Sequence, residues 1–513
     1  MLFSDSAQRC SSFLCSTLAG LVALLPICVA TAAEGPCGLP PTFADSATYT
    51  QTIHVDPAGS DSTGDGSELN PYATLAKAAS VASPGTIIVV HEGTYSTGQY
   101  ISNLQGTETH PLLITSAEGE DPPQFDRNYS GNECIKLVDA KYVILENLII
   151  RRALQNGLNI DDGGSYGTPA EHIVLSNLTI DGVGSGGNND SIKLSGVNYI
   201  RIIGCVIRNT NAGSGIDMVG CHYSEIVFSE FHDGGSNAMQ TKGGTEDILV
   251  YGNLFVNAGS RAIQMGGSTG AAYFRPIDAP FEGKNIRAIA NVIIGSQASI
   301  AFASAVDCLA ANNTIYTPTT WIMRILNENT SKLPPQNGRF FDNIVVFNHS
   351  QVTTFVNIGS NTMPETFSFS NNLWYALDYP GFSGPSLPTP ETDPIIQQDP
   401  QFVDAPSWDF HLLPTSPAGG AGVDVAEVSG DRDAECYLSP PTIGAYEIGF
   451  EPGDLDEDCD VDLDDVDLFL THMLGPAAAT TDEAADLDGD GDADLGDFAV
   501  LAENFTGPGA GCG

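Results

Sequence analysis

The sequence predicts a mainly β protein, a parallel β-helix, followed by a small helical module that binds calcium. Two observations carry this prediction. Short strand-like runs recur from about residue 140 to about residue 375, at spacings of about 22 to 38 residues, as in stacked repeats. Near the C-terminus, residues 454–465 and 486–497 repeat one acidic loop, and a helix-like apolar pattern follows each copy.

Residues 1–33 have the pattern of an export signal. Arg9 precedes a long apolar run, and the small residues 30–33 provide a cleavage site. A membrane anchor is the alternative, although no second apolar span follows. We therefore expect a secreted protein, with no membrane span after signal cleavage, in a compartment that permits disulfides. Eight cysteines remain after residue 33, and this even number permits full pairing without fixing the connectivity.

Residues 34–130 are expected to form an N-terminal cap and the first coils. Within them, residues 53–95 have the pattern of a strand, a turn, a short helix and a strand. The helix is expected at 71–81, with Leu75, Ala78 and Ala79 on one face. It would cover the open end of the stack, because an unpaired coil edge invites aggregation.

Residues 131–450 are expected to form the repeat domain. Aligning the recurring runs places one asparagine per coil at Asn147, Asn177, Asn253, Asn291, Asn313, Asn343 and Asn372, with Cys205 and Glu230 filling the two gaps. Asparagine tolerates the left-handed backbone of a tight bend, and stacked asparagines can bond from coil to coil. The intervening stretches are glycine-rich and lack helical periodicity, which argues against a globular α/β fold. Residues 399–422 and 443–447 are expected to close the stack.

This repeat resembles the right-handed parallel β-helix family of pectate lyases and related proteins. The resemblance implies a right-handed, single-stranded β-helix over most of the mature chain. It also implies a carbohydrate-active protein. No pectate lyase signature sequence is present, so the resemblance rests on the repeat rather than on a matched active-site motif.

Each coil offers a second strand after the asparagine turn, and its outward residues predict one column. The members of this column are Asn159, Lys193, Asp217, Gln240, Gln264, Ala301 and Arg324. Coils stack roughly 4.8 Å apart, so Lys193, Asp217, Lys242 and Arg261 are expected within a short mixed-charge strip. The plainer alternative is an ordinary solvated face with surface ion pairs that contribute little.

The favoured hypothesis for this strip is a polysaccharide lyase cleft. Elimination from a uronic acid needs a neutralised carboxylate and a base for the neighbouring proton. In the related lyases the base is a lysine or arginine beside acidic calcium ligands. By their position in the strip and their residue type, Lys193 or Lys242 would be the base, and Arg261 would bind the substrate carboxylate. A catalytic Ca²⁺ would lie among three aspartates, and three further residues would contact substrate. These aspartates are Asp190, Asp217 and Asp233, and the contact residues are Gln240, Gln264 and Arg324.

Two other functions remain open. Asp161 and Asp162 could supply the paired carboxylates of a glycoside hydrolase, although the motifs that accompany such a pair on this fold are absent. A non-catalytic protein for carbohydrate binding or adhesion would carry the same scaffold and the same tail.

Residues 451–513 are expected to form the calcium module. Alternate acidic side chains of each loop can converge on one cation, which suits the oxygen ligands of Ca²⁺. Val461 and Ala493 occupy the apolar eighth position of the loops. The helix-like runs are Val466, Phe469, Leu470, Met473 and Phe498, Leu501, Ala502, Phe505. The predicted metal ligands are Asp454, Asp456, Asp458, Asp460, Asp462, Asp465, Asp486, Asp488, Asp490, Asp492, Asp494 and Asp497.

This duplicated loop and helix resembles the type I dockerin module. The resemblance implies two structural calcium ions and a partner that is a cohesin-like module or a cell-surface anchor. Cys459 stands where such loops usually have glycine, and it could pair with Cys512. An acidic disordered tail is the alternative, since residues 451–513 hold nineteen acidic residues and no lysine or arginine.

The formal net charge of −45 bounds the partners. Nucleic acid and anionic membranes are poor partners for such a surface. An anionic polysaccharide would be repelled as well, unless Ca²⁺ or a local group of cations receives it.

Overall fold

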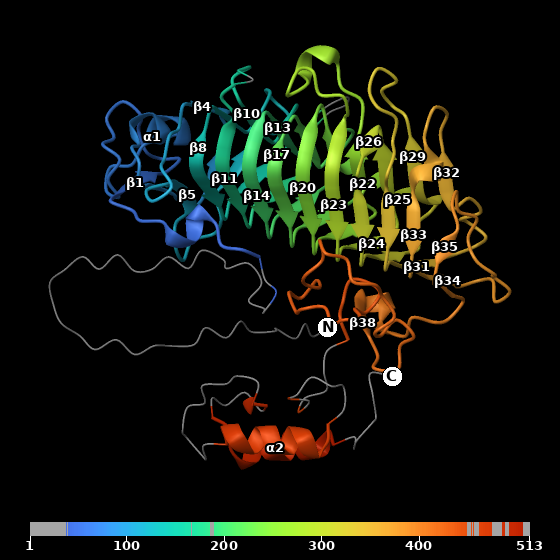
Figure 1. Cartoon of the computed structure of the whole chain (residues 1–513). Helices are drawn as coiled ribbons and strands as arrows, with labels where there is room; N and C mark the ends of the chain where they lie inside the picture. Colours follow the sequence, from blue (N-terminus) through green and yellow to red (C-terminus); the bar gives the residue numbers. More distant parts are fainter. Residues whose placement is uncertain are drawn as a thin grey trace.

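Three long parallel sheets form the body of the protein, and most coils of the chain add one strand to each sheet (Figure 1). The computed structural model describes residues 37, 39–165, 167–184, 189–448, 453, 455, 461–473, 485–487 and 492–505. The predicted export signal, residues 1–33, lies outside this range. Within it, no helix is long and apolar enough to cross a membrane.

Sheet A has 14 strands: β1 (Gln51–Val55), β2 (Thr86–Val90), β5 (Leu112–Ser116), β8 (Lys141–Glu146), β11 (Ala170–Ser176), β14 (Val197–Ile203), β17 (His222–Val227), β20 (Thr245–Tyr251), β23 (Gly283–Ile289), β26 (Ala305–Val306), β27 (Leu309–Ala311), β30 (Arg339–Phe341), β33 (Ser368–Ser370) and β35 (Glu391–Thr392). Sheet B has 12: β3 (Thr94–Tyr95), β6 (Gln124–Asp126), β9 (Ile149–Arg151), β12 (Thr179–Asp181), β15 (Val206–Arg208), β18 (Glu230–His232), β21 (Leu254–Val256), β24 (Val292–Ile294), β28 (Thr314–Tyr316), β31 (Ile344–Phe347), β34 (Leu373–Ala376) and β36 (Ile395–Ile396). Sheet C has 10: β4 (Gln99–Ser102), β7 (Ile135–Val138), β10 (Leu158–Asp161), β13 (Ile192–Ser195), β16 (Ile216–Val219), β19 (Asn237–Lys242), β22 (Arg261–Gly266), β25 (Ala298–Ala303), β29 (Trp321–Leu326) and β32 (Val356–Ile358).

The interior of the stack is one continuous apolar core, because inward side chains of all three sheets meet along its length. The helix α1 (Leu75–Val81) packs on the N-terminal end of this core through Leu75, Ala78 and Ala79, as predicted. The helix begins at Leu75 rather than at residue 71. Thr74 is its N-cap and accepts a hydrogen bond from the Lys77 backbone N–H at 3.1 Å, which fixes the start.

A ladder of buried asparagines links successive coils just before sheet B. Its members are Asn253, Asn291, Asn313, Asn343 and Asn372, all fully buried. The amide nitrogen of each of the first four donates to the amide oxygen of the next at 2.9 Å. Asn372 ends the ladder by donating to Glu391 at 2.6 Å. Each amide also donates to a backbone carbonyl, so these buried polar groups are satisfied inside the stack.

The predicted asparagine column was wrong in part, because it merged two neighbouring columns. Asn147 and Asn177 precede the ladder position by one residue, and their backbones have φ of 56° and 52°. The ladder asparagines do not have positive φ. Ser229, not Glu230, precedes Asn253 in the ladder, and its backbone N–H donates to Asn253 Oδ1 at 2.9 Å. The residue in the left-handed bend and the residue that bonds from coil to coil are therefore two neighbours in the sequence, not one residue.

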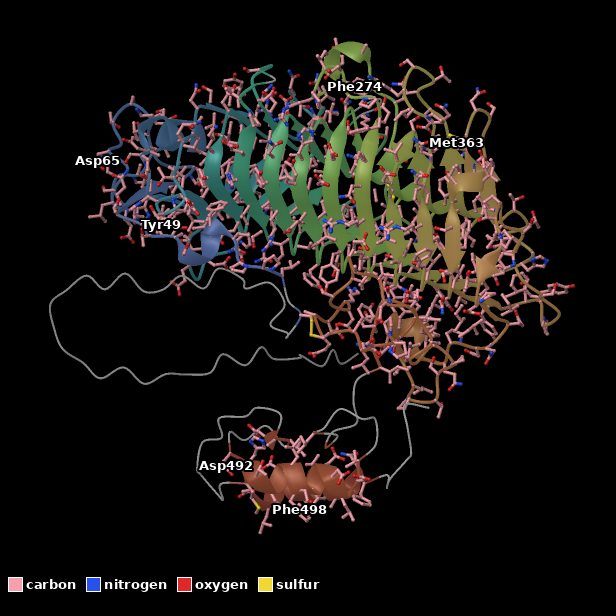
Figure 2. All side chains as sticks on the ribbon, in the orientation of Figure 1. Tyr49, Asp65, Phe274, Met363, Asp492 and Phe498 are labelled. Carbon is pink, nitrogen blue, oxygen red and sulfur yellow. A yellow bond between two sulfur atoms is a disulfide. The ribbon has the colours of Figure 1, made fainter. Side chains whose placement is uncertain are left out.

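The N-terminal segment and the closing segment meet on the outside of the stack. Leu39, Phe43 and Tyr49 pack on sheet A beside Val425 and Val428 of the closing segment. A disulfide joins Cys37 to Cys436 across 399 residues of sequence, and its sulfurs are visible in Figure 2. The closing segment also contains the hairpin of β37 (Phe402–Asp404) and β38 (Asp409–Leu412).

Full pairing of the cysteines is not what the structure has. Cys134, Cys205, Cys221 and Cys308 are free thiols buried in the core, and burial raises the pKa of each to about 12. They act as small apolar side chains. The possible partners Cys459 and Cys512 lie outside the described residues.

The closing segment covers a buried carboxylate. Asp342 has no exposed surface, and its Oδ1 accepts a hydrogen bond from the Val423 backbone N–H at 3.0 Å. Its backbone oxygen accepts from the Gly444 N–H at 2.9 Å. Burial, with a smaller contribution from the charge of Asp424, raises the pKa of Asp342 to about 7.

We predict that Asn313→Ala lowers the free energy of unfolding by about 1–3 kcal/mol, because it removes the acceptor of the Asn291 amide and leaves buried donors unpaired. Denaturant unfolding measures the change. The matched control is Asn177→Gly, an exposed position of positive φ that glycine also adopts, with an expected effect below about 0.5 kcal/mol. Equal effects of the two substitutions would contradict the role assigned to the ladder.

We also predict that Asp342 makes the fold less stable as the pH rises from 3.8 to about 7. The raised pKa means that the folded state binds this proton more tightly than the unfolded chain, so stability falls across that window. Asp342→Asn cannot ionise and should flatten this part of the profile of unfolding temperature against pH. An unchanged slope in the variant would refute the assignment.

Candidate functional site

A polar column crosses sheet C, one residue per coil. The strand register pairs Asn159 with Lys193, Lys193 with Asp217, and Asp217 with Gln240. It continues through Gln264, Ala301 and Arg324. The column predicted from the sequence is therefore confirmed residue by residue. It follows from constant strand pairing, because each coil contributes the same position to the same face.

The centre of the column is a cluster of two buried aspartates and two lysines. Asp190 and Asp217 are each 1% exposed. The Lys193 ammonium contacts Asp217 Oδ2 and lies 3.6 Å from Asp190 Oδ2. Lys242 Nζ lies 3.3 Å from Asp217 Oδ1. The Ser214 backbone N–H donates to Asp190 Oδ1 at 2.7 Å, which holds that carboxylate against the turn before β16.

The charges in this cluster do not favour Lys193, one of the two predicted bases, because a lysine acts as a base only as the free amine. Burial acts to lower the pKa of Lys193, but the charges of Asp217 and Asp190 outweigh it, so this pKa lies above its ordinary value. Burial, and then the charge of Asp217, raise the pKa of Asp190 to about 6. Lys193 is therefore held as an ammonium between the two carboxylates.

Two arginines lie farther along the same face. Arg261 forms an ion pair with Glu328 at 2.7 Å and also contacts the Gln264 side chain. Arg324 donates to Asn357 Oδ1 at 2.9 Å and lies over the Trp321 ring at 4.4 Å. Burial, and then the charge of Arg261, lower the pKa of Arg324.

Two adjacent cavities open along this column and share Lys242 and Ser268. The first, about 440 Å³, is lined by Asp190, Asn237, Gln240, Arg261, Gln264, Arg324 and Glu328, among others. The second, about 640 Å³, is lined by Asn159, Asp161, Asp162, Lys193, Tyr273 and Arg275, among others. All predicted lyase residues except Asp233 therefore line these cavities or contact the cluster between them.

The wall of the cavities is the loop of residues 267–282, between β22 and β23. Arg275 anchors it by donating to Asn198 Oδ1 at 2.7 Å and to the Gly220 carbonyl at 3.0 Å. Phe274 is buried under Lys332, whose Nζ lies 3.7 Å from the ring centroid. Figure 2 labels Phe274 where this loop rises above the sheets.

Asp233 does not join the cluster, which corrects the predicted set of three metal-binding aspartates. It follows β18 of sheet B, its side chain is exposed, and it lines neither cavity. The remaining pair, Asp190 and Asp217, does not fit Ca²⁺ either. Lysine ammoniums already contact both carboxylates, whereas Ca²⁺ needs six to eight oxygen ligands.

Sequence reasoning missed Asn237 and Glu328. Asn237 pairs with Arg261 in the strand register, so a longer alignment of the coils would have found it. Glu328 lies just beyond β29 in a connection of irregular length, where no periodic signal exists.

The described part of the tail contains α2 (Leu463–His472) and α3 (Leu495–Glu503), each at the end of a predicted calcium loop. The N-caps Asp462 and Asp494 have matching backbone angles, φ −134° with ψ −154° and −151°. Val461 and Ala493 are fully buried in a small core with Phe469 and Leu501, as predicted. The other predicted apolar positions are only partly correct. Val466, Met473 and Phe498 pack at the edge of this core, whereas Leu470, Ala502 and Phe505 are exposed.

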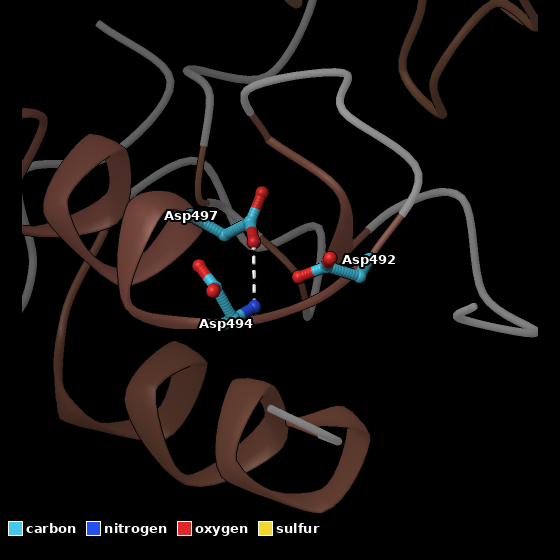
Figure 3. Close-up of side chains that lie close together, drawn as sticks. All are labelled: Asp492, Asp494 and Asp497. Atoms are coloured by element: carbon cyan, nitrogen blue, oxygen red, sulfur yellow. Dashed lines mark hydrogen bonds between the residues drawn. The ribbon is translucent and has the colours of Figure 1, made fainter. Parts of the chain in front are cut away.

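Three of the predicted calcium ligands gather at the start of α3 (Figure 3). Asp492, Asp494 and Asp497 each offer an oxygen, and these atoms lie within 4.8 Å of one another. Asp497 Oδ2 also accepts from the Asp494 backbone N–H at 2.7 Å, and Asp465 does the same for Asp462 in the first loop. This oxygen-only donor set fits Ca²⁺. Asp486 is described at the start of the second loop, whereas Asp454, Asp456, Asp458, Asp460, Asp488 and Asp490 lie outside the described residues.

The comparisons with known proteins identify the fold. A family model described as a protein of unknown function (DUF1565) matches residues 57–118. The chain resembles the crystal structure of pectate lyase Pel9A, with a TM-score of 0.51, 14% identity, and coverage of 79% of this chain and 98% of that one. No curated protein matches the sequence.

Two further solved structures are an alginate lyase from Paenibacillus sp. str. FPU-7 and XylC in complex with xylose. The alginate lyase has a TM-score of 0.39 and 16% identity, covering 60% of this chain and 97% of its own. XylC has a TM-score of 0.44 and 13% identity, covering 69% and 87%. Identities this low show the fold alone, a right-handed parallel β-helix of the kind found in pectate lyase.

We predict that the tail folds around calcium. Chelation should make residues 451–513 sensitive to protease in the full chain, and added Ca²⁺ should restore protection, because the acidic loops repel one another without a cation. Asp497→Ala should raise the calcium concentration needed to protect the second loop and α3 by at least tenfold. The matched control Asp467→Asn, an exposed acid on α2 outside the loop pattern, should behave like the native chain. Equal protection with and without calcium would contradict the module.

Proposed function

We propose that this protein is a secreted, carbohydrate-active enzyme that cleaves an acidic polysaccharide by β-elimination in the groove on sheet C. The observation that carries the proposal is the placement of positive charge. The chain has 19 lysines and arginines against 64 acidic residues. The two adjacent cavities on sheet C, which together form the groove, are nevertheless lined by four of these cations: Lys193, Lys242, Arg261 and Arg324. Such a local group of cations is what an anionic sugar needs on an otherwise acidic surface.

The geometry supports a division of roles. Arg261 and Arg324 would bind and neutralise the carboxylate of the uronic acid, which makes the proton on the neighbouring carbon more acidic. Lys242 lines both cavities and would take that proton as the neutral amine. The bond from the adjacent carbon to the glycosidic oxygen then breaks. The leaving oxygen takes up a proton from solvent water, and the new chain end carries a carbon–carbon double bond. Gln240 and Gln264 would orient the sugar between these groups.

Lys193 is a weaker candidate for the base than Lys242. Asp217 and Asp190 hold its proton, as the direction of its pKa shows. Lys193 would instead fix the two carboxylates. Asp217, 3.3 Å from Lys242 Nζ, would then stabilise the ammonium that forms when Lys242 takes up the substrate proton.

The resemblance of this fold to pectate lyase supports the choice of substrate class without deciding the chemistry. The tail supports a tethered protein: its two loop-and-helix units fit a dockerin-like module that holds two structural calcium ions. Its partner would be a cohesin-like module or a cell-surface anchor. Secretion is supported by the disulfide between Cys37 and Cys436.

A glycoside hydrolase is the second candidate, and one observation favours it. The pKa of Asp190 is raised to about 6 beside a second buried carboxylate, as in a general acid paired with a base. Asp161 and Asp162, the pair suggested by the sequence, line the second cavity instead. A non-catalytic binding protein would release neither unsaturated chain ends nor reducing sugar.

The experiment is to incubate the full chain with polygalacturonate, alginate and a glycosaminoglycan, and to follow both ultraviolet absorbance of unsaturated ends and reducing sugar. We predict a rise in absorbance on one substrate and a fall in kcat of about 10²- to 10⁴-fold for Lys242→Met. Activity should increase toward alkaline pH, since a lysine is a base only as the free amine. Lys284→Met is the matched control, because Lys284 pairs with Glu246 on sheet A.

A rise in reducing sugar without a rise in absorbance would show that the enzyme cleaves by hydrolysis and not by elimination. No product on any of the three substrates, with binding retained, would favour the non-catalytic function. Full activity of Lys242→Met would remove the base assigned here.

A further inference from the structure

Lys193 occupies the space between two buried carboxylates that belong to different coils. Asp190 stands in the turn before β13, and Asp217 lies on β16. The ammonium contacts Asp217 Oδ2 and lies 3.6 Å from Asp190 Oδ2. Asp190 Oδ2 has no hydrogen-bond partner among the described residues, so this ion pair is its main polar contact.

Two adjacent carboxylates in a buried setting repel each other unless a cation or a shared proton lies between them. A divalent metal is the usual cation in sites of this composition. Here the Lys193 side chain reaches that position from the same strand column. The other oxygen of each carboxylate also has a partner. Lys242 contacts Asp217 Oδ1, and the Ser214 backbone N–H donates to Asp190 Oδ1.

We propose that Lys193 permanently fills a divalent-cation position in the groove, so that this site binds its anionic sugar without calcium and only the tail of the chain requires the metal. The ammonium cannot diffuse away, and it stays between the two carboxylates in every state of the groove. The groove then keeps its electrostatic character when calcium is scarce, whereas the tail does not. The consequence for catalysis rests on the function proposed above, but the number of bound ions does not.

The primary experiment counts calcium ions bound to the full chain, by calorimetric titration with calcium chloride. Lys193→Met removes the ammonium and keeps the length of the side chain, so it should bind one more ion than the native chain. Lys136→Met is the matched control. Lys136 precedes Lys193 by two coils in the same column, but it pairs with the single carboxylate of Asp161, at 3.0 Å, and so should create no site.

Two charge changes complete the test. Lys193→Met combined with Asp217→Asn should lose the additional ion, because one carboxylate alone does not hold calcium. Asp190→Asn in the otherwise native chain should leave the number of ions unchanged. This last variant keeps the proposal testable if Lys193→Met does not fold. Loss of one ion in Asp190→Asn, or no gain in a folded Lys193→Met, would overturn the proposal.

The activity arm uses the polyuronate on which the native chain is active. Excess chelator should leave the initial rate within about twofold, while the protease protection of the tail is lost. A rate that falls in chelator and returns with calcium would overturn the proposal even if the enzyme is a lyase. If the native chain shows no activity, the proposed function fails, and the ion counts still decide the role of Lys193.

Discussion

The β-helix and its candidate site depend on coils that stack in register. Parallel strand pairing fixes each coil on the previous one, so residues at equivalent positions form columns along the molecule. The buried asparagine ladder is the part of this constraint that side chains enforce. An asparagine that missed its neighbour by one residue would leave buried donors and acceptors unpaired, which costs more than a solvated mismatch. The same register builds the polar column on sheet C, where the candidate site lies.

The loops between the columns then turn a flat face into a groove. The segment of residues 267–282 folds back over sheet C because Arg275 reaches the Gly220 carbonyl and Asn198 in earlier coils. This contact between distant parts of the chain encloses Lys242 between two cavities. At the other side of the stack, the closing segment and the residues near Cys37 cover sheet A, and the disulfide joins them. The closing segment also packs on sheet B, whereas the two cavities lie on sheet C.

Charge is balanced differently in the two parts of the chain. In the described part of the tail, Asp492, Asp494 and Asp497 converge, and residues 451–513 contain no lysine or arginine to neutralise them. In the groove, lysines from neighbouring coils neutralise the buried aspartates. The charge of the groove is therefore largely balanced by side chains of the chain itself, whereas the charge of the acidic loops is not.

The sequence by itself determined what repeats. It predicted the polar column from Asn159 to Arg324, the contacts of α1 and the paired acidic loops. These features can be predicted because strand pairing and the helical period require residues at regular spacings along the sequence. It did not separate the left-handed column of Asn147 from the ladder of Asn253, since adjacent positions of a coil differ only in backbone angle and burial. Only the tertiary structure decided that Asp233 stands apart, that Lys193 is held by two aspartates, and that Cys37 meets Cys436. These depend on contacts between coils, irregular loops and distant segments, whose distances no sequence spacing encodes.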